Sequence, residues 1–190
     1  GHIQVSGTGE VIDYAVKMRY LPQEKMLNAL LAGSKVTGEM LTRVAQKMVE
    51  FHKKAETSPA ISIYGSIDMV TTNTEENFSG TAKYTGKTIS QETYQKIKSY
   101  TNHFIEANAD LLRKRVVEGR IRDCHGDLHA AHICFNKNDI CIYDCIEFND
   151  RFRYCDVVSE IAFLAMDLDN YGRADLSRSF VDAYVSASGD

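Results

Sequence analysis

Apolar residues recur every three or four positions along most of this chain, and this helical spacing constrains its fold more than any other feature. The clearest example is the segment 38–54, where the pattern predicts one buried helix face. Its stripe consists of Met40, Leu41, Val44, Ala45, Met48, Val49 and His52. Similar spacing predicts helices over about 23–32, 91–118, 157–168 and 174–186, and a fainter pattern covers 67–78. We therefore expect a mostly α-helical domain.

The expected helices have residues at their ends that favour starting or stopping a helix. Thr37, Ser90 and Asp156 each precede a helical pattern, and their side chains can accept a hydrogen bond from the first turn. Gly33 and Gly119 each follow a helical pattern, where glycine commonly ends a helix. These residues set the expected helix boundaries.

Two segments break the helical spacing and are typical of β-hairpins. Near the start, Gly7-Thr8-Gly9 separates extended runs at 3–6 and 11–18. Later, apolar runs at 132–135 and 140–143 flank a short polar turn. A few short strands among many helices place the chain in the α+β class, mostly α.

Composition excludes several classes of protein. The 190-residue chain has a formal net charge of −4, whereas a nucleic-acid-binding domain usually has a basic excess. It contains no apolar run near the ~18 residues of a membrane helix and no signal-peptide pattern. Its five cysteines, an odd number, are typical of reduced core thiols. We expect a cytoplasmic protein that binds neither nucleic acid nor a membrane.

The residues able to carry chemistry are concentrated after the segment 91–118. The segment 124–133 reads Cys-His-Gly-Asp-Leu-His-Ala-Ala-His-Ile and has no periodicity, so it is expected to be a loop. Seventeen residues after Asp127, just past the second hairpin, lies Asp144 in the run Tyr-Asp-Cys-Ile-Glu. The hairpin would bring these two carboxylates to one cleft.

This combination of His-Gly-Asp-Leu-His, hairpin and Asp-x-x-Glu resembles the catalytic segment of aminoglycoside phosphotransferases and choline-kinase-like enzymes. The stretches 148–156 and 162–168 resemble a bacterial branch of unassigned substrate, which is often fused to a P-loop ATPase domain. The resemblance implies the bilobal protein-kinase fold. It also implies ATP-dependent transfer of a phosphoryl group to a hydroxyl of a small molecule.

The resemblance assigns roles to individual residues. Phosphoryl transfer depends mainly on positioning and on neutralising charge. Asp127 would be the catalytic carboxylate that orients the acceptor hydroxyl, with His125 bracing the catalytic loop beside it. Asp144 would hold Mg²⁺ against the phosphates of ATP, and Glu147 would add a further contact. Asp156 resembles the family's structural aspartate, which ties the catalytic loop to the following helix.

His132 departs from the family pattern. The family usually has a metal-binding asparagine five residues after the catalytic aspartate, and this chain has His132 there. An imidazole is a softer ligand than an amide oxygen and suits Zn²⁺ or Mn²⁺ better than Mg²⁺. Either His132 replaces the asparagine as a metal ligand, with Mn²⁺ an alternative to Mg²⁺, or one metal site is weakened.

The first 22 residues resemble the last N-lobe strand and the hinge of such a kinase. On this interpretation Met18, Arg19 and Tyr20 offer backbone groups to adenine. Lys17 resembles a kinase strand lysine only superficially, because Pro22 and a helical pattern follow at once.

The segment 23–190 would then be the helical C-terminal lobe. It would contain a catalytic loop at 124–133 and a metal-binding loop at 144–150. The N-lobe would be largely missing and the C-terminus truncated, so the chain is expected to be a fragment that is inactive alone.

Three functions remain open from the sequence. The first is the phosphotransferase, and the second is a non-catalytic kinase-like module that binds nucleotide or regulates a partner. The third is a zinc protein, suggested by a dense run of ligand types although the paired Cys-x₂-Cys motifs are absent. That run is Cys124, His125, Asp127, His129, His132 and Cys134. Expected partners are a small-molecule substrate, the missing N-lobe, a P-loop ATPase domain, or a second copy bound through exposed apolar surface.

Overall fold

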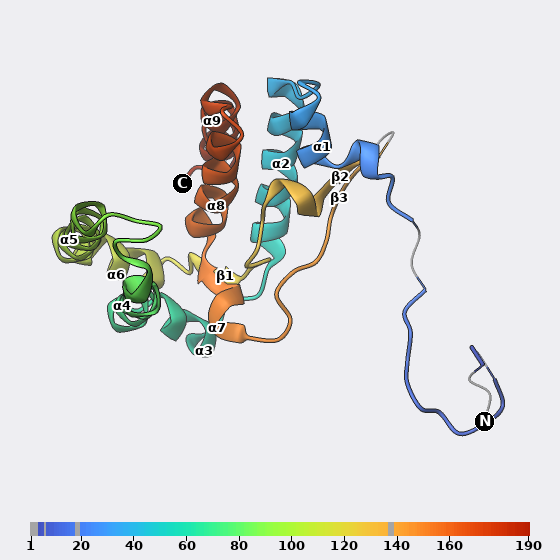
Figure 1. Cartoon of the computed structure of the whole chain (residues 1–190), viewed down its shortest axis with the longest axis horizontal. Helices are drawn as coiled ribbons and strands as arrows, with labels where there is room; N and C mark the ends of the chain where they lie inside the picture. The colour runs from blue at the N-terminus through green and yellow to red at the C-terminus, as the bar shows by residue number, and fades with distance from the viewer. Residues whose placement is uncertain (1–3, 6, 18–19, 137–138) are drawn as a thin grey trace.

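The computed structural model describes residues 4–5, 7–17, 20–136 and 139–190, and it is mostly helical with a few short strands (Figure 1). The longer helices are α2 (Gly38–Lys54), α4 (Ile67–Thr81), α5 (Gln91–Ala107), α8 (Val157–Asn170) and α9 (Ala174–Ser188). The shorter helices are α1 (Leu27–Ala32), α3 (Pro59–Ser62), α6 (Ala109–Val117) and α7 (Asp150–Arg153). Single 3₁₀ turns are η1 (Gln23–Lys25), η2 (Ile63–Gly65), η3 (Ala82–Tyr84) and η4 (Ala130–His132). The α+β class, mostly α, is confirmed.

The predicted helix starts are confirmed by their capping bonds. The Thr37 side chain accepts a hydrogen bond from the backbone N–H of Met40 at 3.3 Å, and Ser90 and Asp156 cap α5 and α8 in the same way. The single helix expected over 91–118 is wrong in one respect. Asn108 leaves the helical conformation, with φ −111° and ψ 19°, and divides the segment into α5 and α6.

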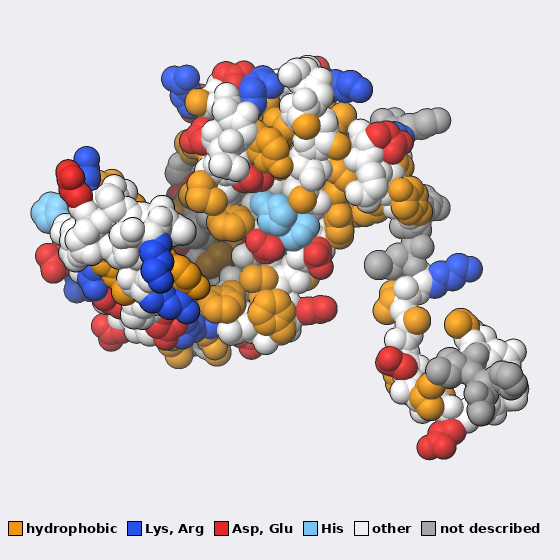
Figure 2. Space-filling view, in the orientation of Figure 1, with side chains coloured by type: hydrophobic (Ala, Val, Ile, Leu, Met, Phe, Trp, Pro, Cys, Tyr) orange, Lys and Arg blue, Asp and Glu red, His pale blue; other side chains and the backbone are white. Residues whose placement is uncertain are grey.

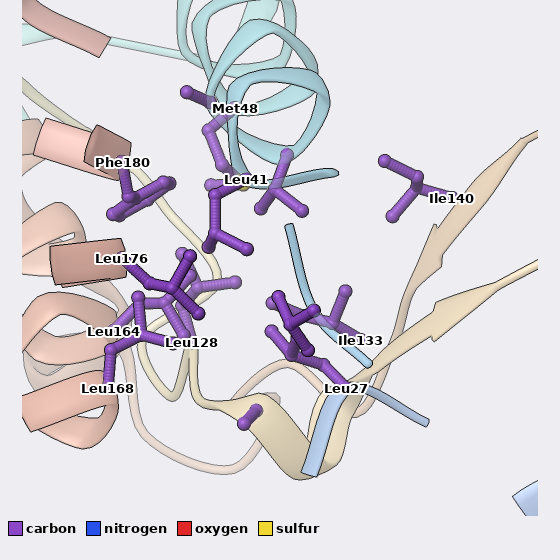
Figure 3. Close-up of a cluster of buried hydrophobic side chains, with 14 of the residues drawn as sticks. Leu27, Leu41, Met48, Leu128, Ile133, Ile140, Leu164, Leu168, Leu176 and Phe180 are labelled. Carbon is purple, nitrogen blue, oxygen red and sulfur yellow. The ribbon is translucent and has the colours of Figure 1, made fainter. Parts of the chain in front are cut away.

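The core lies where α2, α8 and α9 meet (Figure 3). The predicted stripe of α2 is buried there, except that Met40 is only half-buried. Leu41 on α2 packs with Leu164 and Phe180, and each of the three is fully buried. Leu128, from the loop predicted to be catalytic, enters the same cluster (Figure 3). Burying a side chain of this size stabilises the fold by about 1.5–3 kcal/mol, so the loop is anchored at Leu128.

Two small antiparallel strand pairs frame that loop. Strand β1 (Ile121–Asp123) pairs with β4 (Tyr154–Asp156), and β2 (Ile133–Phe135) pairs with β3 (Ile140–Ile142). The β2–β3 hairpin was predicted. The β1–β4 pair was not, because three residues are too few to show a strand pattern.

Helices α4, α5 and α6 lie to one side of α8 and α9 (Figure 1). Ion pairs connect this group to the rest of the chain: Arg115 on α6 pairs with Asp156, and Arg151 on α7 pairs with Glu76 on α4. Between the two parts lies a pocket of about 880 Å³. The helical group thus forms one wall of a cleft beside the loop that carries Asp127.

The hairpin expected near the start of the chain is a wrong prediction for the residues described there. Residues 4–5 and 7–17 contain no strand, and the segment runs away from the helical body (Figure 1). Val11 and Val16, which were to form its second strand, are largely exposed. An isolated two-stranded hairpin is marginal in water unless other elements cover its apolar face.

No helix in the described part of the chain is both long enough and apolar enough to cross a membrane.

Candidate active site

The loop that carries Asp127 makes a tight turn directly after β1. Gly126 adopts φ 82°, a left-handed conformation that favours glycine, and a Cβ built there would lie 2.8 Å from the carbonyl oxygen of Phe152. Leu128 fixes the other side of Asp127 in the core. Asp127 itself stays accessible, with 38% of its side chain exposed. The local sequence therefore presents one carboxylate at the surface on a rigid turn.

Glu160 on α8 holds this turn from the inside. One oxygen of its fully buried carboxylate accepts hydrogen bonds from the backbone N–H groups of His125 and Gly126, at 2.6 and 2.8 Å. Its other oxygen lies 2.7 Å from Nε2 of His52 on α2. Nδ1 of His52 is in turn 2.8 Å from the hydroxyl of Tyr184 on α9. Three core helices therefore position the loop through one carboxylate.

The role expected for Asp156 is thus filled by Glu160. Asp156 instead caps α8 and forms a bidentate pair with Arg115, with N···O distances of 2.5 and 2.8 Å. Sequence reasoning missed Glu160, although an acidic residue inside the apolar stripe of the segment 157–168 is a signal of a buried, paired carboxylate.

His125 braces the loop against the hairpin, as expected from the sequence. Its Nε2 lies 2.7 Å from the carbonyl oxygen of Tyr143, so Nε2 carries the hydrogen. Its Nδ1 accepts a hydrogen bond from the backbone N–H of Asp127 at 3.3 Å. Both ring nitrogens are therefore engaged in positioning, and the residue is buried.

Asp127 and Asp144 lie on either side of His132. Nδ1 of His132 is 3.0 Å from the carbonyl oxygen of Asp127 and 3.7 Å from a carboxylate oxygen of the same residue. Nε2 of His132 is 3.4 Å from a carboxylate oxygen of Asp144. Figure 2 shows histidine and acidic side chains gathered on this face, next to a hollow lined by hydrophobic side chains. The hairpin thus brings together three of the residues singled out in the sequence.

The other predicted site residues are not joined to this group by any contact among the residues described. Glu147 is exposed, and Tyr20 has 76% of its surface exposed. Met18 and Arg19 lie outside the described residues. The roles of Glu147 and of the segment 18–20 stay predictions.

The histidines do not favour the zinc site that the ligand types in the segment 124–134 suggested. Ligand atoms of Asp127, His129 and His132 lie within 4.8 Å of one another. However, Nδ1 of His129 accepts a hydrogen bond from Ala131, so its Nε2 carries the hydrogen and points toward Asp127 at 3.6 Å. Cys134 is buried in strand β2. This arrangement turns the Nε2–H of His129 toward the Asp127 carboxylate and leaves His129 without a free lone pair.

A second group of possible metal ligands is buried, and hydrogen bonds already occupy its ligand atoms. It consists of His52, Cys124 and Glu160. The pKa of the Cys124 thiol is raised by its contact with Cys155 and by burial, which keeps the sulfur protonated. A metal would need the thiolate.

Asp144 and His132 are the residues best placed to hold a divalent cation. The Asp144 side chain is 71% exposed and offers hard oxygen ligands, which suit any divalent ion. The imidazole of His132 fits Mg²⁺ less well than an amide oxygen would. The residues therefore fit a divalent cation, but they depart from the set that Mg²⁺ prefers.

The pocket beside the loop is large enough for a small molecule. Its volume of about 880 Å³ is within the usual range for ligand pockets. Gly126 and Ile146 form the side nearest Asp127, and Tyr100, Phe104 and Phe152 add aromatic surface. Its arginines are already paired with carboxylates, so the wall is mainly apolar and close to neutral.

Comparisons with known proteins support the fold and leave the activity open. No family model matches the chain. Uncharacterized proteins of Mycobacterium tuberculosis and Mycobacterium bovis are 31% identical over 189 residues. The match covers 100% of this chain but only 38% of theirs, so the chain spans about two fifths of the length of these relatives.

Solved structures of a glucosamine kinase resemble the chain in fold. One crystal form has a TM-score of 0.53 at 15% identity, covering 83% of this chain and 44% of the kinase. The complex of that kinase with glucosamine, ADP and inorganic phosphate has a TM-score of 0.51 at 14% identity, covering 83% and 45%. At such low identity the likeness establishes a kinase-like fold alone.

Proposed function

We propose that this chain forms the C-terminal lobe of an ATP-dependent phosphotransferase that acts on a hydroxyl group of a small molecule. The observation that carries the proposal is the placement of Asp127 and Asp144 on either side of His132 in a chain with a kinase-like fold. Phosphoryl transfer needs one carboxylate for the attacking hydroxyl and another for a cation on the phosphates. On this proposal the chain falls among the aminoglycoside-phosphotransferase and choline-kinase-like enzymes.

Asp127 is the residue proposed to handle the acceptor. Its exposed carboxylate would orient the hydroxyl and accept its proton as the new O–P bond forms. Glu160 holds the two residues before it, His125 accepts a hydrogen bond from its backbone N–H, and the N–H of His129 points toward its carboxylate. Because Glu160 and His125 are buried, the backbone that carries this carboxylate is held in position before substrate binds.

The donor side of the site is proposed to use Asp144 and a divalent cation. The cation, when bound, would neutralise charge on the triphosphate. ATP as donor is supported by the ADP and phosphate bound to the structurally similar glucosamine kinase. Residues 1–22, with the segment 18–20 as hinge, and an N-lobe in a longer protein would complete the nucleotide site around the lobe at 23–190.

The acceptor is proposed to enter the pocket between the helical group α4–α6 and the catalytic loop. Gly126 and Ile146 bring this pocket next to Asp127. The aromatic lining favours an alcohol with an apolar part over a polycation, because the carboxylates Glu76 and Asp156 in the wall are already neutralised by arginines.

Calorimetric titration of the chain with ATP, with and without a divalent cation, tests the nucleotide site. We expect cation-dependent binding in the wild type, weakened about tenfold or more in Asp144→Ala because a charged ligand is lost. The matched control is Asp182→Ala, since Asp182 is an exposed carboxylate on α9. Equal binding by the wild type and Asp144→Ala would contradict the proposed role of Asp144.

Asp127→Ala separates an enzyme from a non-catalytic module. We expect it to leave nucleotide binding within about threefold of wild type, while transfer by a protein with a complete ATP site falls about 10²-fold or more. Undiminished transfer would contradict the assignment of Asp127. Nucleotide binding without transfer in the wild type would favour the regulatory module.

A further inference from the structure

We propose that His132 and Asp144 form a cation site that prefers a transition-metal ion such as Mn²⁺, Co²⁺ or Zn²⁺ over Mg²⁺. The inference rests on the proposed function for the identity of the cleft, and it concerns which ion the cleft holds. It follows from the hydrogen bonds of one imidazole and from its spacing to one carboxylate.

The hydrogen bonds of His132 leave one ring nitrogen free. Nδ1 lies 3.0 Å from the carbonyl oxygen of Asp127, which can only accept, so Nδ1 carries the hydrogen. In the neutral ring Nε2 then has a free lone pair. This lone pair faces a carboxylate oxygen of Asp144 at 3.4 Å, which is also an acceptor. Two acceptors that face each other in this way need either a proton or a metal ion between them, and we propose the metal ion.

The spacing of the two atoms fits a metal ion. Ligand atoms about 2.1 Å from one ion are about 3.4 Å apart at a tetrahedral angle and about 3.0 Å apart at a right angle. The observed 3.4 Å therefore fits tetrahedral coordination as it stands. Octahedral coordination needs only a small movement of the exposed Asp144 side chain.

The surroundings of His132 are those of a metal-binding histidine. Such a histidine usually donates its other ring N–H to a carboxylate or a backbone carbonyl, and His132 donates to the carbonyl of Asp127. Its ring is 13% exposed and packs against the ring of His129, with centroids 3.9 Å apart. Asp144 adopts φ 66°, an uncommon conformation for a residue other than glycine that is often found in ligand clamps. The ring of His132 is therefore held in place before an ion arrives, and the backbone of Asp144 is set while its side chain can adjust.

The chemistry of an imidazole decides the preference among ions. Mg²⁺ takes oxygen ligands and keeps its waters, whereas imidazole nitrogen binds Zn²⁺ and Co²⁺ well and Mn²⁺ less strongly than these two. His129 donates its hydrogen toward Asp127 and so supplies no third lone pair. The remaining coordination positions are left for water or phosphate oxygens. We expect affinity to increase from Mg²⁺ through Mn²⁺ to Zn²⁺, as imidazole-containing sites do.

The test is direct metal binding to the chain without nucleotide. Free Mn²⁺ is counted by its electron paramagnetic resonance signal, and Mg²⁺ is added as competitor. We expect Mn²⁺ to bind about tenfold or more tightly than Mg²⁺, since one ligand is nitrogen. The spin-echo spectrum of bound Mn²⁺ should show modulation from an imidazole nitrogen.

The decisive variant is His132→Asn, which restores an amide oxygen at the same position. It should still bind a cation, lose the nitrogen modulation, and reduce the preference for Mn²⁺ over Mg²⁺ by about tenfold. His103→Asn, at an exposed histidine on α5, is the matched control and should behave as the wild type. Circular dichroism confirms that each variant is folded.

Three results would overturn the proposal. The first is an unchanged metal preference in His132→Asn, and the second is no nitrogen modulation in the wild type. The third is no binding of either ion, which would mean that a proton on Nε2 of His132 bridges to Asp144 instead of a metal. Failure of the proposed function is distinguishable. If the chain binds Mn²⁺ through an imidazole but binds no ATP, the metal site stands and the phosphotransferase proposal fails. If the chain binds ATP but His132→Asn leaves the metal preference unchanged, the phosphotransferase proposal stands and the metal site fails.

Discussion

Replacing Glu160 tests how the loop that carries Asp127 is held. The buried carboxylate accepts two backbone hydrogen bonds from the loop, at 2.6 and 2.8 Å, and lies 2.7 Å from Nε2 of His52. Glu160→Ala removes the carboxylate that makes all three contacts. Glu160→Gln keeps the shape, because its amide oxygen can face the loop while its NH₂ group faces His52.

The magnitudes expected for the two variants differ. Hydrogen bonds to charged groups contribute about 1.5–3 kcal/mol each, and breaking a buried pair by removing one partner costs about 3–5 kcal/mol. We expect Glu160→Ala to lower the free energy of unfolding by about 3–5 kcal/mol, a large part of the ~5–15 kcal/mol typical of a domain. Glu160→Gln loses the charge but not the number of hydrogen bonds, so we expect a loss of about 1–2 kcal/mol. His52 would then donate from Nδ1 to Tyr184.

Urea unfolding followed by circular dichroism measures these free energies, provided the dependence on denaturant is unchanged. Amide hydrogen exchange at His125 and Gly126 reports the loop directly and should be faster in both variants. Glu50→Gln, at an exposed position on α2, is the control and should change stability by less than about 0.5 kcal/mol. A loss below about 1 kcal/mol in Glu160→Ala would refute the reasoning, because removing three buried hydrogen bonds should lower the free energy of unfolding by more than that.

Two further predictions concern the turn and a surface pair. Gly126→Ala should lower the free energy of unfolding by at least about 1–2 kcal/mol, because Gly126 has a left-handed backbone conformation. Gly80→Ala, at an open position within helix α4, should raise it. Equal urea midpoints for the two variants would contradict this. A hydrogen bond from Lys98 lowers the pKa of Glu75, so the pair's contribution is present above the ordinary glutamate pKa and lost as pH falls through the lower folded value. NMR titration should show this low midpoint in the wild type and an ordinary one in Lys98→Met.

The sequence alone predicted most of the helices, because their signals are local. Thr37 and Met40 are three residues apart, and the apolar stripe of α2 repeats within a single helix. The β2–β3 hairpin is also short-range, and so Asp127 before it and Asp144 after it could be expected to lie close together. Propensity, capping and periodicity are sufficient for such features.

Where local signals were ambiguous or depended on packing, the sequence misled or said nothing. The apolar alternation near the start suggested a strand, but no element covers it and no strand forms among the residues described there. Strands β1 and β4 hold three residues each and lie far apart in the chain, so neither has a pattern of its own.

Only the tertiary structure decided how the site is held. His52 and Glu160 are 108 residues apart, and their contact exists because α2 and α8 pack on the same core. The free lone pair of His132 likewise depends on which carbonyl its other nitrogen meets. The sequence determined which residues are candidates for the site. Their distances, hydrogen-bond partners and protonated atoms follow from packing between distant segments, which local patterns do not encode.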